Sequence, residues 1–396
     1  MLVMNDTPSG YLLDEDIDRS TVPALKVIRN VSAAEVFAGG VADMDFKAPP
    51  TVLKALQNRL DHGVFGYEKI STGLIPALQN WLSVRHNWRV EYDHIVRSPN
   101  VLNSLAMAAS LFTKPGDGII LQPPVFMDFF DILHENNRQL INNPLIIDNG
   151  QYQMDFVDLE EKASMPNTKM IYLCNPHNPV GRVWTEAELR TLGDICIRHH
   201  VMIVADELHG DIVYSKNYYT PFASLGIDYA KNSLTCISPA KTFNIAACCS
   251  SFTIIPNEGF RKIFAAENSR LTVNKNNAFA NVAMEAAYKG GGPWLDEVIL
   301  YLHKNVDIVR EYLLKIPGVE LIEPEGTFLL WLDFRSFNLK ANELDTFLKS
   351  NAKWFVVRGI SFGDEGSGFA RVNIACTHAK MISAMERLTL AISEKY

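Results

Sequence analysis

The chain has 396 residues, of which 47% are hydrophobic and 21% charged, a composition typical of globular proteins with a large apolar core. Its 37 Lys and Arg stand against 45 Asp and Glu, and the resulting net charge of −8 argues against nucleic acid or an anionic membrane as a partner. The acidic residues 1–18 lack the basic start and apolar run of a signal peptide, and no apolar stretch approaches the ~20 residues that cross a bilayer, so we predict a cytoplasmic protein.

Between about residues 115 and 255, short apolar runs alternate with helix-like segments. Each run is bounded by Pro, Gly, Asn or Asp, as buried strands are. The predicted strands are 118–121, 139–141, 169–174, 201–205, 233–237 and 251–255. Residues 186–199 have helical spacing, with Thr185 as the N-cap and Glu188 three residues later. This alternation predicts an α/β fold with a mostly parallel open sheet and helices on both faces.

The C-terminal part of the chain has a different pattern. After the glycine-rich residues 290–293, apolar side chains recur at three- and four-residue steps over 294–316, which predicts one long amphipathic helix. Strands at 328–332 and 370–374 and a helix from Lys380 follow. We therefore predict a large domain of residues 51–290 and a smaller α+β domain of residues 1–50 with 291–396. Two-domain enzymes often close a cleft in this way.

Polar residues stand directly after three of the predicted strands. Residues 175–181 (Asn-Pro-His-Asn-Pro-Val-Gly), 206–209 (Asp-Glu-Leu-His) and 238–243 (Ser-Pro-Ala-Lys-Thr-Phe) each follow a strand. Ligands of open parallel sheets bind beyond the carboxyl ends of the strands. We therefore expect these three segments to meet at one edge of the sheet.

The side chains of these segments suit the chemistry of pyridoxal 5'-phosphate (PLP). That chemistry needs a lysine amine that forms an imine with the cofactor and later acts as base and acid. It also needs a carboxylate that keeps the pyridine nitrogen protonated, so that the ring accepts electrons. Lys241 and Asp206 fit these two roles. Asn178 and His209 are candidates for the donor to the ring's phenolate oxygen.

Together with further stretches in the same order, these segments resemble a known family. The further stretches are residues 41–46 (Val-Ala-Asp-Met-Asp-Phe), 66–67 (Gly-Tyr), 98–101 (Ser-Pro-Asn-Val), 123–126 (Pro-Pro-Val-Phe) and 369–373 (Phe-Ala-Arg-Val-Asn). The chain resembles the class I/II aminotransferases of PLP fold type I, and most closely their cystathionine β-lyase or carbon–sulfur lyase branch. The resemblance implies PLP as cofactor, an amino acid as substrate and a homodimer.

The resemblance also implies roles at the cofactor ring. Lys241 would be the Schiff-base lysine, and Asp206 would pair with the pyridine nitrogen. Asn178 would contact the ring hydroxyl, with His209 beside it, and Phe126 would stack on the ring. Most close relatives carry Tyr at the position of Phe126, so a hydroxyl is lost there.

Further roles concern the phosphate and the substrate. The phosphate would be bound by the backbone amides of Asn100 and Val101, by the Ser238 hydroxyl, and by Tyr67 of the neighbouring subunit; helix N-termini suit anions. The substrate carboxylate would be clamped in a two-pronged contact by Arg371, aided by Asn178 and by the amide of Ala42. Many aminotransferases have an arginine on the phosphate where this chain has Cys-Cys-Ser at 248–250, and lyase relatives tend to have Trp where it has Gly-Gly at 39–40.

The predicted activity is β-elimination from L-cystathionine or related cysteine S-conjugates, because residues 42–46 and 207–209 resemble the lyase branch. The alternative is amino acid transamination, which would use the same residues. A regulator that keeps the fold without catalysis is a third interpretation, since a fold alone does not fix a function.

Other interpretations of single features stay open at this point. Lysines are mostly exposed, an aspartate after a strand can cap a helix, and the remaining site residues could serve packing or surface ion pairs. Residues 359–363 (Gly-Ile-Ser-Phe-Gly) match the G-x-S-x-G nucleophile motif of serine hydrolases, although only His378 follows as a base. The six cysteines form no C-x-x-C pair and fit neither a disulfide framework nor a zinc site.

Overall fold

The computed structural model describes residues 10–28, 35–248 and 250–395. Its main feature is a seven-stranded sheet with strand order β1-β9-β8-β7-β6-β2-β3. The strands are β1 (Ile95–Ser98), β2 (Gly118–Leu121), β3 (Gln139–Asn142), β6 (Thr168–Cys174), β7 (Met202–Asp206), β8 (Ser233–Ile237) and β9 (Ser251–Ile254). The strands β3, β2, β6, β7 and β8 pair in parallel, which confirms the predicted mostly parallel open sheet.

Strand β9 departs from the parallel pairing of its neighbours, and β1 was not predicted. β9 pairs antiparallel with both β1 and β8. The helical elements among the described residues between β8 and β9 are the one-turn helix α8 (Pro239–Thr242) and a 3-10 turn (Ala246–Cys248). A parallel connection usually contains a helix that runs back along the sheet. Neither of these elements is long enough for that, so β9 starts at the edge where β8 ends.

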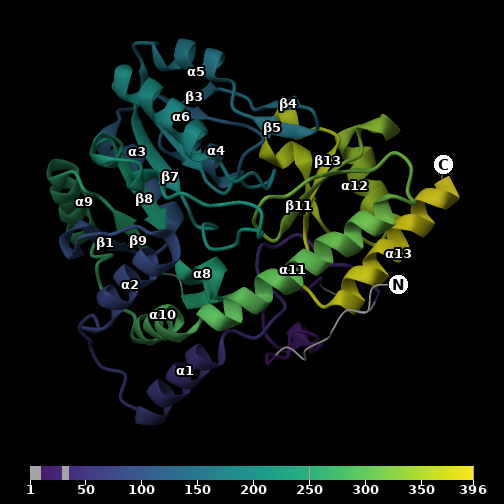
Figure 1. Ribbon diagram of the computed structural model, residues 1–396, viewed down its shortest axis with the longest axis horizontal. Helices are drawn as coiled ribbons and strands as arrows, with labels where there is room; N and C mark the ends of the chain where they lie inside the picture. Colours follow the sequence, from purple (N-terminus) through teal and green to yellow (C-terminus); the bar gives the residue numbers. More distant parts are fainter. Residues whose placement is uncertain (1–9, 29–34, 249, 396) are drawn as a thin grey trace.

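Helices cover both faces of this sheet (Figure 1). In β6, Met170 and Tyr172 share one core cluster with α3 (Val101–Phe112), α4 (Asp128–Glu135) and α9 (Glu258–Arg270), whereas Ile171 and Leu173 share another with α5 (Phe156–Ala163) and α6 (Glu186–Arg198). This alternation follows from the two-residue period of a strand. The predicted capping box of Thr185 and Glu188 starts α6.

A second, smaller sheet lies on the other side of the molecule (Figure 1). It is antiparallel with strand order β10-β11-β13-β12. Its strands are β10 (Glu320–Ile322), β11 (Leu329–Asp333), β12 (Val357–Arg358) and β13 (Phe369–Asn373), and its helices are α12 (Ala341–Ser350) and α13 (His378–Lys395). The predicted long helix is α11 (Gly292–Leu313), which at 1.5 Å per residue is about 33 Å long and packs against α13.

The remaining elements lie outside the two large sheets. They are α1 (Pro50–His62), α2 (Leu74–His86), α7 (Ile227–Lys231), α10 (Ala278–Gly290) and a hairpin of β4 (Ile146–Asp148) and β5 (Gln151–Gln153). One core cluster joins buried residues of α1, α2 and α10 with those of α11, β11, β13 and α13. The core is therefore continuous across residue 290, and the division into domains 51–290 and 1–50 with 291–396 stays a prediction.

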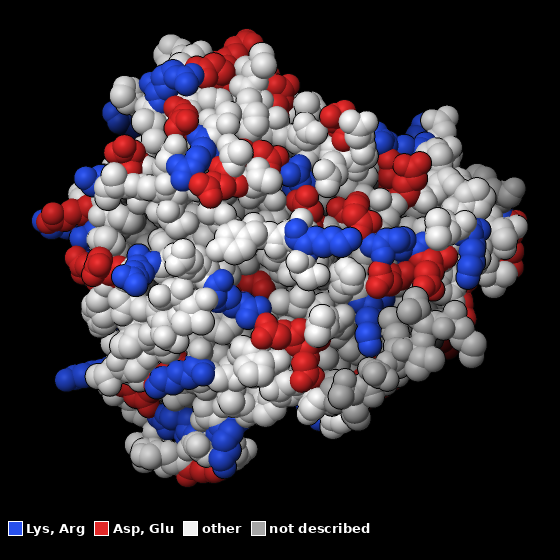
Figure 2. Space-filling model, in the orientation of Figure 1, with Lys and Arg blue, Asp and Glu red and all other residues white. Residues whose placement is uncertain are grey.

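The segment before α1 lies against the second sheet. Phe37 forms a bridge with Trp354, the Asn373 amide donates to the Gly39 carbonyl at 2.9 Å, and the Asp45 amide donates to the Ala375 carbonyl at 2.8 Å. These contacts hold residues 37–45 against the second sheet, and the hydrogen bond from Lys241 Nζ to the Ala42 carbonyl joins the same segment to the end of the first. No helix in the described part of the chain is long and apolar enough to cross a membrane, and charges of both signs are interspersed on the face that Figure 2 shows.

Candidate functional site

The three polar segments begin side by side at one edge of the large sheet. Strand β7 lies between β6 and β8, and its last residue, Asp206, is opposite Cys174 on one side and Cys236 on the other. Residues 175–181, 206–209 and 238–243 therefore leave the sheet at the same level. The predicted convergence of the three segments is confirmed by this register.

Lys241 lies on the single turn α8, which starts directly after β8. Its Nζ donates a hydrogen bond of 2.5 Å to the backbone carbonyl of Ala42. Burial and the positive charge of Arg371 lower the pKa of Lys241, while the negative charges of Asp43 and Asp206 act in the opposite direction. A lowered pKa increases the fraction of neutral amine, which is the nucleophilic and basic form.

Asp206 presents a buried carboxylate at the end of β7. Its Oδ1 accepts a hydrogen bond of 3.1 Å from the Leu208 amide. Burial raises the pKa of Asp206 to about 6, although the Leu208 amide and the charge of Lys241 lower it in part. Because burial disfavours the bare charge, this carboxylate holds a proton, or a protonated partner, more firmly than an exposed aspartate does.

Arg371 and Asn178 come from different sheets and meet at the site. Arg371, on β13, donates from Nη1 to Asn178 Oδ1 at 3.0 Å and from Nη2 to the Gly40 carbonyl at 2.9 Å. Its guanidinium lies 5.0 Å from the centre of the Phe362 ring. Burial lowers the pKa of Arg371 to about 10, so the group keeps its positive charge at neutral pH.

His209 and Phe126 are placed at the same edge of the large sheet. His209 is buried, its ring lies 5.6 Å from that of Phe328, and its Nδ1 has no hydrogen-bond partner among the described residues. Burial and the charges of Lys241 and Arg371 lower the pKa of His209 to about 3, so its imidazole is neutral. Phe126, between β2 and α4, is half-buried and meets Phe129 edge to face at 6.0 Å.

The predicted phosphate-binding residues cap helices. Asn100 caps α3 through a 2.8 Å bond from the Asn103 amide, and the first amides of a helix, including that of Val101, have no partner within the helix. Ser238 caps α8 by accepting from the Ala240 amide at 3.2 Å, while its hydroxyl donates to the Ser250 carbonyl at 2.6 Å. Residues 248–250 are Cys-Cys-Ser where many aminotransferases have an arginine, and of these Cys249 lies outside the described residues.

Tyr67 is also a predicted site residue, but within the described part of a single chain no contact joins its side chain to the other site residues. Its side chain is fully exposed, and the neighbouring Val64 and Phe65 are 66% and 55% exposed. An exposed cluster of large apolar side chains is unusual on an isolated subunit.

The sequence did not single out Asp128, which lies at the site, or Arg97, which lies near the predicted phosphate-binding Ser238 because both contact Ser250. Asp128, the first residue of α4, is half-buried, and its charge acts on the pKa of both Arg371 and Lys241. Arg97, on β1, donates from Nη2 to Ser250 Oγ at 3.3 Å, and its Nε has no partner among the described residues. An acidic residue in a first helical turn has a local explanation, and β1 itself was not predicted.

No group of three described His, Cys, Asp or Glu side chains could hold a metal ion.

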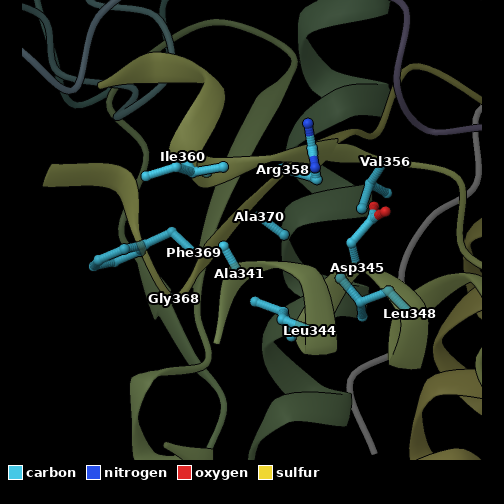
Figure 3. A pocket seen from close by; sticks show the side chains of 11 residues that line it. Ala341, Leu344, Asp345, Leu348, Val356, Arg358, Ile360, Gly368, Phe369 and Ala370 are labelled. Atoms are coloured by element: carbon cyan, nitrogen blue, oxygen red, sulfur yellow. The ribbon is translucent and has the colours of Figure 1, made fainter. Parts of the chain in front are cut away.

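The G-x-S-x-G stretch has a packing explanation. A Cβ atom at Gly359 would overlap the Gly366 carbonyl oxygen, so the glycine permits close contact of two backbone segments. Figure 3 shows the small pocket beside Gly359, which is lined mainly by apolar side chains of α12 and β13, and by Asp345 and Arg358. His378, the predicted base of a hydrolase, bonds Asn305 and stacks on Tyr301.

Comparison with known proteins places the chain in a family. Residues 39–388 match the model of the family "Aminotransferase class I and II". The chain is 42% identical to the cystathionine β-lyase PatB of Bacillus subtilis, covering 89% of this chain and 92% of that protein.

Two solved structures are similar over nearly their whole length. The structure of cystalysin from Treponema denticola, which contains a pyridoxal 5'-phosphate cofactor, has a TM-score of 0.94 and 33% identity, covering 98% of this chain and 100% of that one. A PLP-bound putative aminotransferase from Clostridium difficile has a TM-score of 0.93 and 39% identity, covering 96% and 100%. The chain therefore belongs to the class I and II aminotransferase family.

Proposed function

We propose that this protein is a PLP-dependent carbon–sulfur β-lyase that cleaves L-cystathionine or related cysteine S-conjugates to a thiol, pyruvate and ammonia. The observation that carries the proposal is the pair of the half-buried Lys241 and the buried Asp206 at adjacent strand ends, each of which acts on the pKa of the other. The likeness to the cystathionine β-lyase PatB supports lyase chemistry at this pair, and the likeness to cystalysin supports PLP as the cofactor.

The side chains of the site fit PLP. His209 Nδ1 and Arg371 Nε are buried polar atoms without a hydrogen-bond partner among the described residues. Such atoms are costly unless a ligand or water satisfies them. A ring with a nitrogen, a hydroxyl and an aldehyde offers partners for Asp206, Asn178 and Lys241, and the start of α3 suits its phosphate.

The protein's residues divide the chemistry among themselves. When bound, PLP supplies an electron sink that stabilises a carbanion at the substrate's α-carbon. The Lys241 amine would hold the cofactor and, once free, would accept the substrate's α-proton on Nζ. The Asp206 carboxylate would accept the hydrogen bond of the protonated pyridine nitrogen, and burial strengthens the attraction between these two opposite charges. The Asn178 amide would donate to the ring oxygen, while its Oδ1 accepts from Arg371 Nη1 and thereby positions the guanidinium.

Arg371 orients the substrate. A guanidinium has five N–H donors, and the bonds to Asn178 and Gly40 leave donors for a carboxylate. The amide of Ala42 would add a further donor to that carboxylate. Thiols have a pKa of about 8.5, so a thiolate leaves the β-carbon as a stable anion without a strong acid to protonate it.

One assay tests the proposed function. Purified protein with bound PLP is incubated with L-cystathionine and no keto acid, and thiol and pyruvate are measured. We expect both products in equal amounts, and none from the Lys241→Ala variant. Thiol and pyruvate both absent, together with amino transfer to an added keto acid, would contradict the lyase assignment.

That last outcome would support the second candidate, an amino acid aminotransferase. The match to the aminotransferase family and the likeness to the C. difficile protein favour it. Both activities use Lys241, Asp206 and Arg371, so only the fate of the substrate distinguishes them.

We also propose that the protein is a homodimer in which Tyr67 reaches the phosphate of the neighbouring subunit. The full exposure of Tyr67 and the exposed Val64 and Phe65 support this. Co-expression of Tyr67→Ala and Lys241→Ala chains tests it. If the dimer shares sites, each mixed dimer contains one site with both native residues, and about a quarter of the wild-type activity returns. If Tyr67 serves its own subunit, no activity returns.

We further propose a cytoplasmic location. The five described cysteines are all free thiols, which is usual in a reducing compartment. Fractionation of the source cells, with the protein followed by antibody, tests this: its recovery outside the cytoplasmic fraction would contradict the proposal.

A further inference from the structure

Asp211 is a half-buried carboxylate that the proposed chemistry does not use. It lies in the turn after β7, five residues beyond Asp206. Its Oδ1 accepts hydrogen bonds from Trp81 Nε1 at 2.9 Å and from His86 Nε2 at 2.7 Å, and its Oδ2 accepts one from Thr242 Oγ1 at 2.7 Å. Burial raises the pKa of Asp211, but these donors and His86 outweigh burial and lower the pKa overall. The carboxylate therefore stays charged.

The Thr242 bond connects this carboxylate to the lysine. Thr242 directly follows Lys241, is fully buried, and ends α8. Helix α8 has four residues, and a single turn is unstable by itself because nucleation of a helix is unfavourable. The position of Lys241 therefore depends on tertiary anchors of α8.

Those anchors come from three directions. Ser238 caps the start of the turn. Phe243 packs edge to face on Trp81 at 5.3 Å, in the apolar core. At the end of the turn, Thr242 is bonded to Asp211, and Asp211 is itself fixed to α2 through Trp81 and His86. Of these anchors, the bond to Asp211 is the charge-assisted one, and such bonds are the stronger kind.

The segment that follows β7 thus carries both Asp206 and the anchor of α8. Strand β7 ends at Asp206, and the turn from Asp206 to Asp211 is closed by bonds from the Leu208 amide to Asp206 Oδ1 and from the Gly210 amide to the Glu207 carbonyl. A rigid turn keeps the spacing between the carboxylate for the pyridine nitrogen and the anchor of the lysine helix.

We propose that Asp211 is a positioning residue, which holds α8 through Thr242 so that the Lys241 amine points at the reacting carbon. The inference rests on the proposed function. Small errors in the position of a reacting group lower rates strongly, whereas Arg371, on β13, binds the substrate independently of α8. Loss of the bond should therefore reduce kcat and leave KM nearly unchanged.

The decisive substitution is Thr242→Val, which removes the hydroxyl but keeps the shape. Thr242→Ser keeps the hydroxyl and serves as the rescue. The matched control is Thr168→Val: Thr168 is also buried and its hydroxyl donates at 2.7 Å to the Lys162 carbonyl, but it lies at the opposite end of β6 from the site. Asp211→Asn is the second test of the same contact if Thr242→Val does not fold.

Two measurements are made on each full-length protein. The first is kcat and KM for thiol release from L-cystathionine by the holoenzyme. The second is the pH dependence of Lys241 acetylation in the cofactor-free protein, by trace acetic anhydride and peptide mapping. We expect Thr242→Val to lower kcat roughly ten- to a hundredfold with KM within about twofold, and to move the Lys241 acetylation curve to higher pH, because a less firmly held amine is more exposed to water.

Thr242→Ser should stay within about threefold of wild type in both measurements, and Thr168→Val should lower only the thermal stability. The proposal is overturned if Thr242→Val keeps the wild-type kcat and acetylation curve, or if Thr242→Ser loses as much as Thr242→Val. A wild-type protein that releases no thiol would refute the proposed function instead, and the acetylation curves would still report whether Asp211 positions Lys241.

Discussion

Replacement of Arg371 by lysine tests how the site holds its substrate. Lysine keeps the charge but not the planar fork of donors. In the structure, the fork donates to Asn178 Oδ1 and to the Gly40 carbonyl, at 3.0 and 2.9 Å. The single ammonium group of a lysine cannot replace the planar pair of N–H donors of the guanidinium. At least one charge-assisted bond to the substrate carboxylate is therefore lost.

The size of the effect follows from that lost bond. A hydrogen bond to a charged group contributes about 1.5–3 kcal/mol, and each ~1.4 kcal/mol is about a factor of ten. Arg371→Lys should therefore lower kcat/KM for L-cystathionine roughly ten- to a hundredfold. Most of the loss should be in KM, because the carboxylate is bound equally before and during the reaction.

The assay compares two substrates and two variants. An ester of the substrate at the reacting amino acid's carboxyl group lacks the negative charge, so wild type and Arg371→Lys should differ on it by less than about threefold. Arg335→Lys is the matched control, since Arg335 also lies over a phenylalanine, Phe369, and forks to Asp333 in the same small sheet. Equal losses on the acid and the ester, or an equal loss in the control, would refute the role of Arg371.

Further predictions concern charge and packing around the site. In the cofactor-free protein, the pKa of Asp206 is about 6 in the folded state against an ordinary value of 3.8, so between these pH values the folded state keeps a proton that the unfolded state has lost. The free energy of unfolding should therefore fall by up to about 3 kcal/mol as pH rises through this window. Urea unfolding of Asp206→Asn should lack that loss. Asp128→Asn should move the acidic limb of the kcat/KM profile to lower pH, because Asp128 raises the pKa of Lys241; a shift to higher pH would contradict this. Gly359→Ala should destabilise the fold by several kcal/mol, more than the ~1–3 typical of overpacking, since its Cβ would overlap backbone atoms of Gly366 and Phe369, whereas Ser361→Ala should keep thiol release within about twofold and thereby exclude a hydrolase nucleophile.

The parts of the site that the sequence predicted are those governed by a general rule of sheets. Polar residues after consecutive parallel strands meet at one edge, and this rule was enough to place Asp206 beside the segments of Asn178 and Lys241. The alternating burial of β6 and the capping box of α6 have equally local causes.

The parts that were missed depend on contacts between distant residues. The bond between His86 and Asp211 joins residues 125 positions apart, and the one between Arg371 and Asn178 spans 193. Asp128 has the local pattern of an ordinary first-turn acid. Gly359 matched a nucleophile motif, although the structural reason for a glycine at this position is the close approach of the Gly366 backbone. The direction of β9 depends on a short connection that periodicity does not reveal.

A crystal structure of the protein with PLP bound tests the central claim most directly. The account predicts a covalent bond from Lys241 Nζ to the cofactor and an oxygen of Asp206 about 3 Å from its pyridine nitrogen. A cofactor joined to another lysine, or a ring nitrogen that faces away from Asp206, would contradict it.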